Sequence, residues 1–301
     1  TNLDGYRPGR RKAPPALPDR WIVTRLHQTV GDVRRALAAY RFNDAAGAIY
    51  HFLWHDYCDW YIEWSKLALY RSEDPAARAR TQATLVEVLE ATLRLLHPFM
   101  PFLTEEIWQR LPKGPQAPES IMIARYPRAS RRKADAGALA EVAPVMSVVV
   151  AVRTLRSEMQ IPPARPLTVV VRPPGDGVVA GILRENAAAI GALARAEVRI
   201  DPDAARPPHS AIKVTESGDV YVPLEGVLDL AEERARLGRE LAKAETEIGR
   251  LEAKLGRTEF RERAPAEVVA REETRRDEQR GLATKLREAI ERLDALGAAH
   301  G

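Results

Sequence analysis

The sequence is poor in cysteine and in long apolar runs. Its single cysteine, Cys58, excludes a disulfide framework and fits a reducing compartment, so we expect a cytoplasmic protein. The run VMSVVVAV is too short to span a membrane and no signal-peptide pattern is present, so we expect no membrane partner. Because residues 1–18 begin with Thr1 and are rich in proline and arginine, we expect a linker and a chain cut from a longer one.

Catalytic and phosphate-binding motifs are also absent. The sequence has neither a GxGxxG nor a P-loop, and no Ser/His/Asp or Cys/His arrangement has supporting context. His51, His55 and Asp59 share one helical face beside Cys58, which is a spacing that zinc could use. The metalloprotease motif needs glutamate after its first histidine, however, and Phe52 stands there. We therefore expect no catalytic residue and no metal site, with histidines that belong to a helical bundle.

Aromatic residues are few, but they are concentrated. Of eighteen in the chain, ten lie between Tyr40 and Tyr70. Residues 1–133 also carry 21 Lys and Arg against 14 Asp and Glu, a balance that suits a polyanionic partner. Two interpretations of the aromatics stay open, a packed helix core or a platform on which bases stack. The stripe expected in the core is Tyr50, Trp54, Tyr57, Tyr61 and Trp64, and the expected platform is Arg41, Phe42 and Asn43.

Apolar residues at helical spacing predict a bundle over residues 19–133. "HPFMPF" forms a rigid corner in it, since prolines three apart do not fit inside a continuing helix. The four expected helices are one capped by Asp19, one from about Asn43 to Tyr70, one capped by Asp74 with Pro75 first and ending at Pro98, and a short one capped by Thr104.

Two further parts follow along the chain. Short β-branched runs, with an Ala-rich helix between the first two, predict a small α+β module at 134–226. Residues 227–301 carry heptads about a break at Pro265, which predicts an antiparallel coiled-coil hairpin about 40 Å long. This hairpin could dimerise, or it could be a lever whose tip, Phe260, Arg261 and Arg263, makes a distant contact. Its expected seam is Leu230, Leu237, Leu241, Ala244, Ile248, Leu251 and Leu255 against Leu282, Leu286, Ala289, Leu293 and Leu296, weakened by Glu272, Arg275 and Gln279.

Four segments resemble a known family. "RFNDAAGAIYHFLWHDYCDWYIEWSK" and "LLHPFMPFLTEEIWQRL" resemble the helical anticodon-binding domain of class I aminoacyl-tRNA synthetases of the Leu/Ile/Val branch, and "RTLRSEMQIPP" resembles the segment after it. "EFRERAPAEVV" within a heptad hairpin resembles the C-terminal arm of the valyl subfamily. The resemblance covers nearly the whole chain from Asp19 onward, and the arm favours the valyl subfamily over the isoleucyl and leucyl ones.

The resemblance implies a mainly α, tRNA-holding region that is not catalytic by itself. Its partners would be tRNA(Val) and the remainder of a monomeric synthetase, which uses ATP and Mg²⁺ and edits mischarged tRNA. The signatures HIGH and KMSKS are absent from this sequence. The implied anticodon contacts are Arg41, Phe42 and Asn43, together with Trp60 and Lys66. A scaffold protein that dimerises through its coiled coil and binds no RNA stays open as an alternative.

Overall fold

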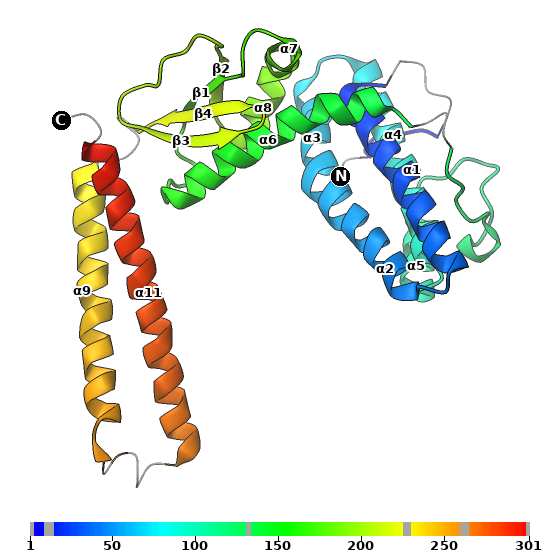
Figure 1. Ribbon diagram of the computed structural model, residues 1–301. Coiled ribbons are helices and arrows are strands. Elements are labelled where there is room, and N and C mark those ends of the chain that lie inside the picture. Colours follow the sequence, from blue (N-terminus) through cyan, green and yellow to red (C-terminus); the bar gives the residue numbers. More distant parts are fainter. Residues whose placement is uncertain are drawn as a thin grey trace. The chain divides into compact units, whose positions relative to one another are not determined.

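A computed structural model describes residues 3–8, 15–130, 134–224, 230–258, 260 and 265–298. The fold is mainly helical with one small sheet and a C-terminal helical hairpin, which confirms the predicted fold class (Figure 1). The chain divides into two compact units, residues 1–147 with 181–193 and residues 148–180 with 194–301. The four-part division predicted from the sequence stays a prediction.

The first unit is built on helices that run up and down in turn. A single helical stretch with wider turns in its second half covers residues 42–71 and packs against both α1 and α4 (Figure 1). Because successive helices reverse direction, the α1–α2 corner and the α4–α5 corner lie at the same end of the bundle. The bounds are α1 Leu17–Ala38, α2 Phe42–His51, η1 Phe52–Ile62, α3 Glu63–Lys66, η2 Leu67–Arg71, α4 Pro75–Leu96, α5 Pro101–Arg110 and η3 Ile121–Ile123.

The helix starts agree with the sequence in one case and differ in two. Asp74 caps α4 as predicted, because its side chain accepts a hydrogen bond from the Ala76 amide at 2.9 Å. Asp19 is not the cap of α1, since the helix begins earlier and Asp19 accepts from the Ala16 amide at 3.2 Å from its third position. Thr104 likewise lies inside α5, where its hydroxyl donates to the Met100 carbonyl at 2.8 Å.

Asp19 is instead a buried junction between three helices. Its carboxylate is 1% exposed, and it accepts a hydrogen bond from the Tyr61 hydroxyl at 2.6 Å. The Arg80 side chain pairs with the same carboxylate at 3.2 Å. Burial, and then the Asp19 charge, raises the pKa of Tyr61 well above its ordinary value. This network fixes the positions of α1, η1 and α4 relative to one another.

The predicted aromatic stripe is only partly in the core. Tyr57, Tyr61 and Trp64 are buried, but Tyr50 and Trp54 are 63% and 54% exposed, so the prediction was wrong for these two. The reason is that Phe52–Ile62 is a π-helix, whose turns are wider than those of an α-helix. The buried face runs through Ala45, Ile49 and Phe52 before the wide turns and through Tyr57 and Tyr61 after them.

One helix is more apolar than the sequence analysis expected. By length and composition alone, α6 (Ala136–Glu158) could cross a membrane, which corrects the prediction that no apolar run is long enough. Half of its apolar window is nevertheless buried inside the protein. The valines at 142, 145, 148, 149 and 152 have no exposed surface, which is typical of a core helix.

The second unit contains a four-stranded mixed sheet in the order β2-β1-β4-β3. β1 pairs in parallel with β2 and antiparallel with β4, and β3 and β4 form a hairpin. Gly218 closes this hairpin at φ +126°, where a side chain would meet the Arg172 carbonyl. The predicted β-branched runs are confirmed as β1 Thr168–Arg172, β2 Glu197–Ile200, β3 Ser210–Thr215 and β4 Gly218–Pro223. Along the chain, α7 Val178–Glu185 and α8 Ala187–Ala194 follow β1 and precede β2, and residues 181–193 of this stretch belong to the first unit.

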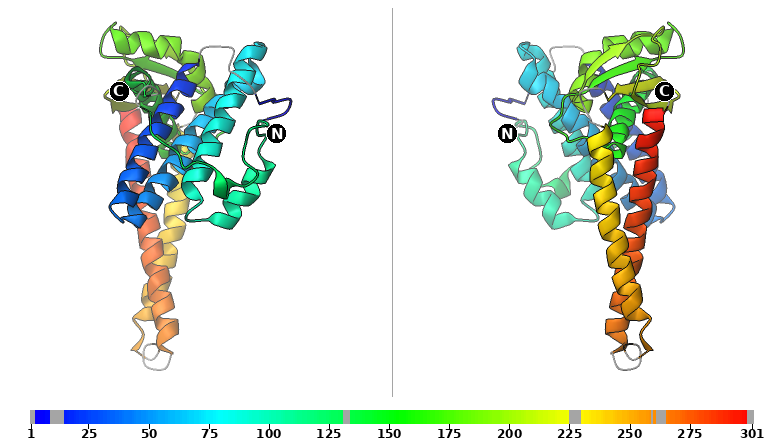
Figure 2. Two further views of the ribbon diagram at one scale, coloured as in Figure 1. Left: turned by 90° about the vertical axis from the view of Figure 1, so that its right-hand side faces the viewer. Right: turned by 90° about the vertical axis from the view of Figure 1, so that its left-hand side faces the viewer.

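The hairpin consists of α9 (Leu230–Leu255) and α11 (Ala266–Ala298), which lie side by side in Figures 1 and 2. At 1.5 Å per residue, α9 is about 39 Å long, as predicted. Leu282 is exposed and Ala283 is buried in its place, so the seam is shifted by one residue there. The buried seam is Leu237, Ala244, Leu251 and Leu255 against Ala283, Leu286, Ala289 and Leu293.

Ion pairs across the hairpin occupy the polar positions that interrupt the heptads. Glu272 pairs with Lys254 at 2.9 Å, and Arg275 pairs with Glu247 at 3.0 Å. Towards the other end of the hairpin, Arg234 pairs with Asp294. Two of the three polar residues that weaken the heptad, Glu272 and Arg275, therefore have cross-hairpin partners.

Candidate nucleic-acid interface

The α1–α2 corner holds an exposed tyrosine in a strained backbone conformation. Tyr40 has φ +56°, in the left-handed region where glycine is normally found. Its amide donates to the Leu37 carbonyl at 3.0 Å, and the Arg41 amide donates to the Ala36 carbonyl at 2.9 Å. These two bonds form a Schellman motif that ends α1. A bulky residue at this position costs free energy, and such strain often marks a functional site.

Three side chains at this corner form an exposed cluster. The ring of Tyr40 is 81% exposed and that of Phe42 is 55% exposed, and they meet edge to face with centroids 6.4 Å apart. Arg41 lies between them in the sequence, and its guanidinium pairs with Asp44 at 3.1 Å and is mostly exposed. Asn43 follows in the first turn of α2 and is exposed as well. The predicted platform residues Arg41, Phe42 and Asn43 are thus together at the surface.

The α4–α5 corner adds apolar side chains at the same end of the bundle (Figure 1). Phe102 is 88% exposed, and Met100 and Leu103 are close to half exposed. Exposed rings that have no packing role in the bundle are unusual for a folded unit, and clusters of them mark contact surfaces. We call the residues Tyr40, Arg41, Phe42, Asn43, Met100, Phe102 and Leu103 the bundle-end surface.

The other two residues predicted to contact the anticodon, Trp60 and Lys66, do not lie at the bundle-end surface. Trp60 is half-buried in η1, and Lys66 is exposed in α3, where its ammonium pairs with Glu63 at 2.6 Å. Eighteen residues of helix separate Trp60 from Phe42, a distance of roughly 20 Å or more along the axis. Trp60 and Lys66 therefore belong to a different part of the bundle.

Tyr50 and Trp54 form a second exposed aromatic pair on the outer face of the same helix. Their rings are parallel within 5°, with centroids 6.2 Å apart. His51 and His55 lie beside them, and the His55 ring contacts Asp59 at 3.3 Å. Among the described residues, no group of three or more His, Cys, Asp or Glu could hold a metal ion. Burial, and then Asp59, raises the pKa of the Cys58 thiol, which keeps it protonated.

At the tip of the hairpin only one predicted residue can be described. Phe260 is half-buried, and the Lys254 ammonium lies 4.8 Å from the centroid of its ring. A cation over an aromatic face is attracted by it, so Lys254 holds the ring near the end of α9. Arg261 and Arg263 lie outside the described residues.

Tyr40 and Phe102 belong to the bundle-end surface but were not predicted from the sequence. The buried residues of α5, Thr104 and Trp108, are four apart and define its inner face. Phe102 precedes Thr104 by two residues, about 200° around the helix, and so faces outward. The signal for Phe102 was present in that spacing, whereas nothing in the pattern gives the left-handed backbone of Tyr40.

Comparisons with known proteins match two stretches of the chain. The family model "anticodon-binding domain of tRNA ligase" matches residues 19–171. A second model, "valyl tRNA synthetase tRNA binding arm", matches residues 229–294, which include most of the α9–α11 hairpin. The bundle-end surface lies within the first match.

Three similar proteins carry the same name. The chain is 40% identical over 277 residues to a valine–tRNA ligase of Geobacter sulfurreducens, covering 90% of this chain and 31% of that protein. It is 37% identical to one of Syntrophotalea carbinolica, over 93% of this chain and 31% of that protein. With one of Listeria monocytogenes the identity is 36% over 98% of this chain and 33% of that protein. The chain thus spans about a third of the length of these relatives.

Proposed function

The chain belongs to the family of tRNA-ligase anticodon-binding domains, with an arm of the valyl-tRNA synthetase kind, and we propose that it holds tRNA(Val) for a valine–tRNA ligase. In this role the bundle-end surface contacts the anticodon, and the α9–α11 hairpin supports the tRNA elsewhere. The reaction of the whole enzyme joins valine to its tRNA in the cytoplasm. This chain supplies binding and orientation for it.

The bundle-end surface is the observation that carries the proposal. Single-stranded RNA is read where its bases are unstacked, and such bases stack on exposed aromatic and arginine planes. Phe42 and Phe102 offer two such faces at one end of the bundle, with the Arg41 guanidinium beside the first. An anticodon loop presents three unstacked bases together, which is a fitting partner for a surface of this kind. Asn43 adds an amide that can hydrogen-bond a base edge.

The chain's own residues do not fit ATP or magnesium. It has no glycine-rich phosphate loop and neither HIGH nor KMSKS, and the described residues contain no cluster of metal ligands. ATP and Mg²⁺ would therefore be held by the other two thirds of a ligase like its relatives. We propose that the aminoacylation itself takes place on those other two thirds.

Recognition of the tRNA has a physical reason in such an enzyme. A pocket for valine rejects an isosteric amino acid that adds a hydroxyl by only about a hundredfold. Accuracy therefore also depends on choosing the right tRNA, and the anticodon is its most readable part. In the proposed complex the hairpin, at about 39 Å, reaches a part of the tRNA distant from the anticodon through Phe260, Arg261 and Arg263. Trp60 and Lys66, also named as anticodon contacts, lie too far from Phe42 along the helix to contact the same base.

The test is binding of the 301-residue chain to valine tRNA and to a copy with a changed central anticodon base. Both affinities are measured at several salt concentrations, by anisotropy of labelled tRNA. We expect at least a tenfold preference for the native anticodon that persists as salt rises, because stacking and base-edge contacts release few counterions. Equal binding with a steep salt dependence would contradict anticodon reading and leave only a basic surface.

The oligomeric state is tested in the same preparation. We propose a monomer, since the seam of α9 is already covered by α11 within one chain. Sedimentation of the free chain should give one species at all concentrations, and addition of tRNA should give a one-to-one complex. A dimer that binds no tRNA would favour a scaffold protein instead.

A further inference from the structure

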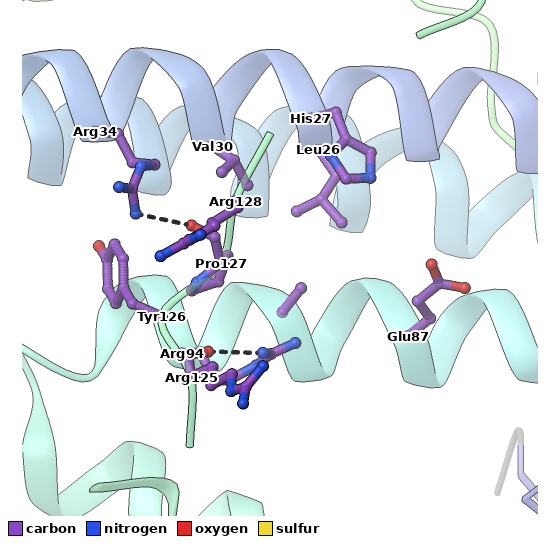
Figure 3. Close-up of a pocket in the computed structure, with 11 residues that line it drawn as sticks. Leu26, His27, Val30, Arg34, Glu87, Arg94, Arg125, Tyr126, Pro127 and Arg128 are labelled. Carbon is purple, nitrogen blue, oxygen red and sulfur yellow. Dashed lines mark hydrogen bonds between the residues drawn. The ribbon is translucent and has the colours of Figure 1, made fainter. Parts of the chain in front are cut away.

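A groove lies on the side of the bundle, between α1 and α4, in the first unit. It has a volume of about 590 Å³, which is the size of a site for a small ligand or one nucleotide unit. The segment 125–128 crosses it between the two helices, as Figure 3 shows. Its lining residues are Leu26, His27, Val30, Arg34, Glu87, Ala91, Arg94, Arg125, Tyr126, Pro127 and Arg128.

Positive charge dominates the groove. Four arginines line it against a single glutamate, Glu87. The Arg94 guanidinium pairs with Glu90 and donates to the Arg125 carbonyl at 2.8 Å, so this arginine is held in place and partly neutralised. The other three arginines have no carboxylate partner among the described residues. Such a concentration of like charge costs free energy unless an anion offsets it.

Two of the arginines are held in place by the backbone of the crossing segment. Arg34 donates from Nη1 to the Pro127 carbonyl at 3.3 Å, and Arg94 donates to the Arg125 carbonyl (Figure 3). The Tyr126 hydroxyl donates to the Leu95 carbonyl at 3.2 Å and fixes the segment on α4. The Nε of Arg94 is buried without a hydrogen-bond partner in the described part of the chain. The groove therefore has fixed donors, and the described residues leave the buried Nε of Arg94 unsatisfied.

The groove leads towards the bundle-end surface. Along the chain, Arg34 precedes Tyr40 by six residues and Arg94 precedes Met100 by six. At 1.5 Å per residue, Arg34 is about 6 Å from the end of α1 and Arg94 is about 3 Å from the end of α4. A chain of phosphates that leaves the bundle-end surface would reach the groove within a few nucleotides.

We infer that this groove binds the phosphodiester backbone of RNA, next to the bases held at the bundle end. Arg34, Arg125 and Arg128 make the phosphate contacts, and the apolar floor of Leu26, Val30 and Ala91 excludes water beneath the ribose. Guanidinium groups suit phosphate oxygens because they donate two parallel hydrogen bonds. This inference rests on the proposed function for the identity of the RNA, but it concerns other residues.

The test compares the salt dependence of tRNA binding in two groove variants and a control. Arg34→Gln and Arg128→Gln each remove one charge, and Arg128 has no side-chain partner in the described residues, so its loss leaves the fold intact. The control is Arg35→Gln, the next residue on α1, which pairs with Asp32 and does not line the groove. Inorganic pyrophosphate serves as a free phosphate compound, and its binding is followed by thermal stabilisation of each variant.

We expect the slope of log affinity against log salt to become shallower by about 0.7–1 in each groove variant and to stay unchanged in Arg35→Gln. The preference for the native anticodon should be the same in all of them, because the groove contacts no base. Unchanged slopes, with wild-type protein that still prefers the native anticodon, would overturn the groove and leave the proposed function standing.

Two other outcomes separate the remaining possibilities. Unchanged slopes together with pyrophosphate binding that Arg128→Gln abolishes would overturn the inference in favour of a free phosphate compound. A shallower slope in the groove variants, together with wild-type protein that shows no anticodon preference, would support the groove as an RNA contact and reject the anticodon function. The phosphate-binding groove and the anticodon function can therefore be rejected independently of each other.

Discussion

Replacing Asp19 by Asn should destabilise the helical bundle far more than the same change at an exposed aspartate of α1 would. The substitution keeps the size of the side chain but removes the charge that faces Arg80, whose side chain is only 15% exposed. Breaking a buried ion pair from one side costs about 3–5 kcal/mol, because the remaining charge is left uncompensated. The Asn oxygen still accepts hydrogen bonds, so we expect the lower value, about 3 kcal/mol of unfolding free energy.

The control is Asp32→Asn on the same helix, where the partner Arg35 and Asp32 are both more than half exposed. A surface pair of this kind contributes about 0–1 kcal/mol. All five tryptophans lie between Trp21 and Trp108, so urea unfolding followed by tryptophan fluorescence reports on the first unit alone. A loss in Asp19→Asn that is within 1 kcal/mol of the loss in Asp32→Asn would refute the assignment of Asp19 as a buried junction.

Three further predictions concern pH, the hairpin and the strained corner. Burial raises the pKa of Tyr61, so the unfolded chain loses this proton at a lower pH than the folded chain does. The unfolding free energy of the first unit should therefore be constant with respect to this group below about pH 10 and should fall above it. In urea titrations at increasing pH, Tyr61→Phe should make that fall less steep. Leu251→Ala removes a fully buried seam residue and should lower amide protection in α9 and α11 by about 2–4 kcal/mol in hydrogen exchange, whereas the exposed Leu282→Ala should change it by less than 0.5 kcal/mol. Tyr40→Gly relieves the left-handed strain and should leave urea stability within about 1 kcal/mol of wild type, while tRNA binding weakens by about 1–3 kcal/mol; a stability loss above this range would contradict the strain.

Local chemistry made much of the fold predictable. Asp74 before Pro75 marks the start of α4, and the β-branched runs mark the four strands, because these signals act over a few residues. The heptads predicted the hairpin and its length for the same reason. These features depend on neighbours in the sequence, so a single sequence carries them.

Features that depend on distant residues were not predictable. Asp19 has the residue type of a cap, but its position is decided by Tyr61 and Arg80 across the bundle. The exposure of Tyr50 and Trp54 follows from a π-helix, which a count at 3.6 residues per turn does not reveal. Ala283 occupies the seam position predicted for Leu282, because the facing helix sets the register.

Part of the candidate site could be predicted from the sequence. Arg41, Phe42 and Asn43 are recognisable as a cation, a ring and an amide at a helix entrance. Phe102 joins them only when the up-and-down order of the helices is known, because 60 residues separate it from Phe42. The groove between α1 and α4 could not be predicted from the sequence, since its arginines come from three segments that have no common motif.

The most direct test of the anticodon role is the affinity ratio between valine tRNA and its central-base variant, measured for wild-type chain and for Phe42→Ala. Phe42 is more than half exposed, so its truncation should leave the fold intact. Loss of one stacking face costs about 1–3 kcal/mol. The account predicts that the ratio falls towards one in Phe42→Ala while the salt dependence stays as in wild type. A ratio that Phe42→Ala leaves unchanged would contradict the reading of the anticodon at this end of the bundle.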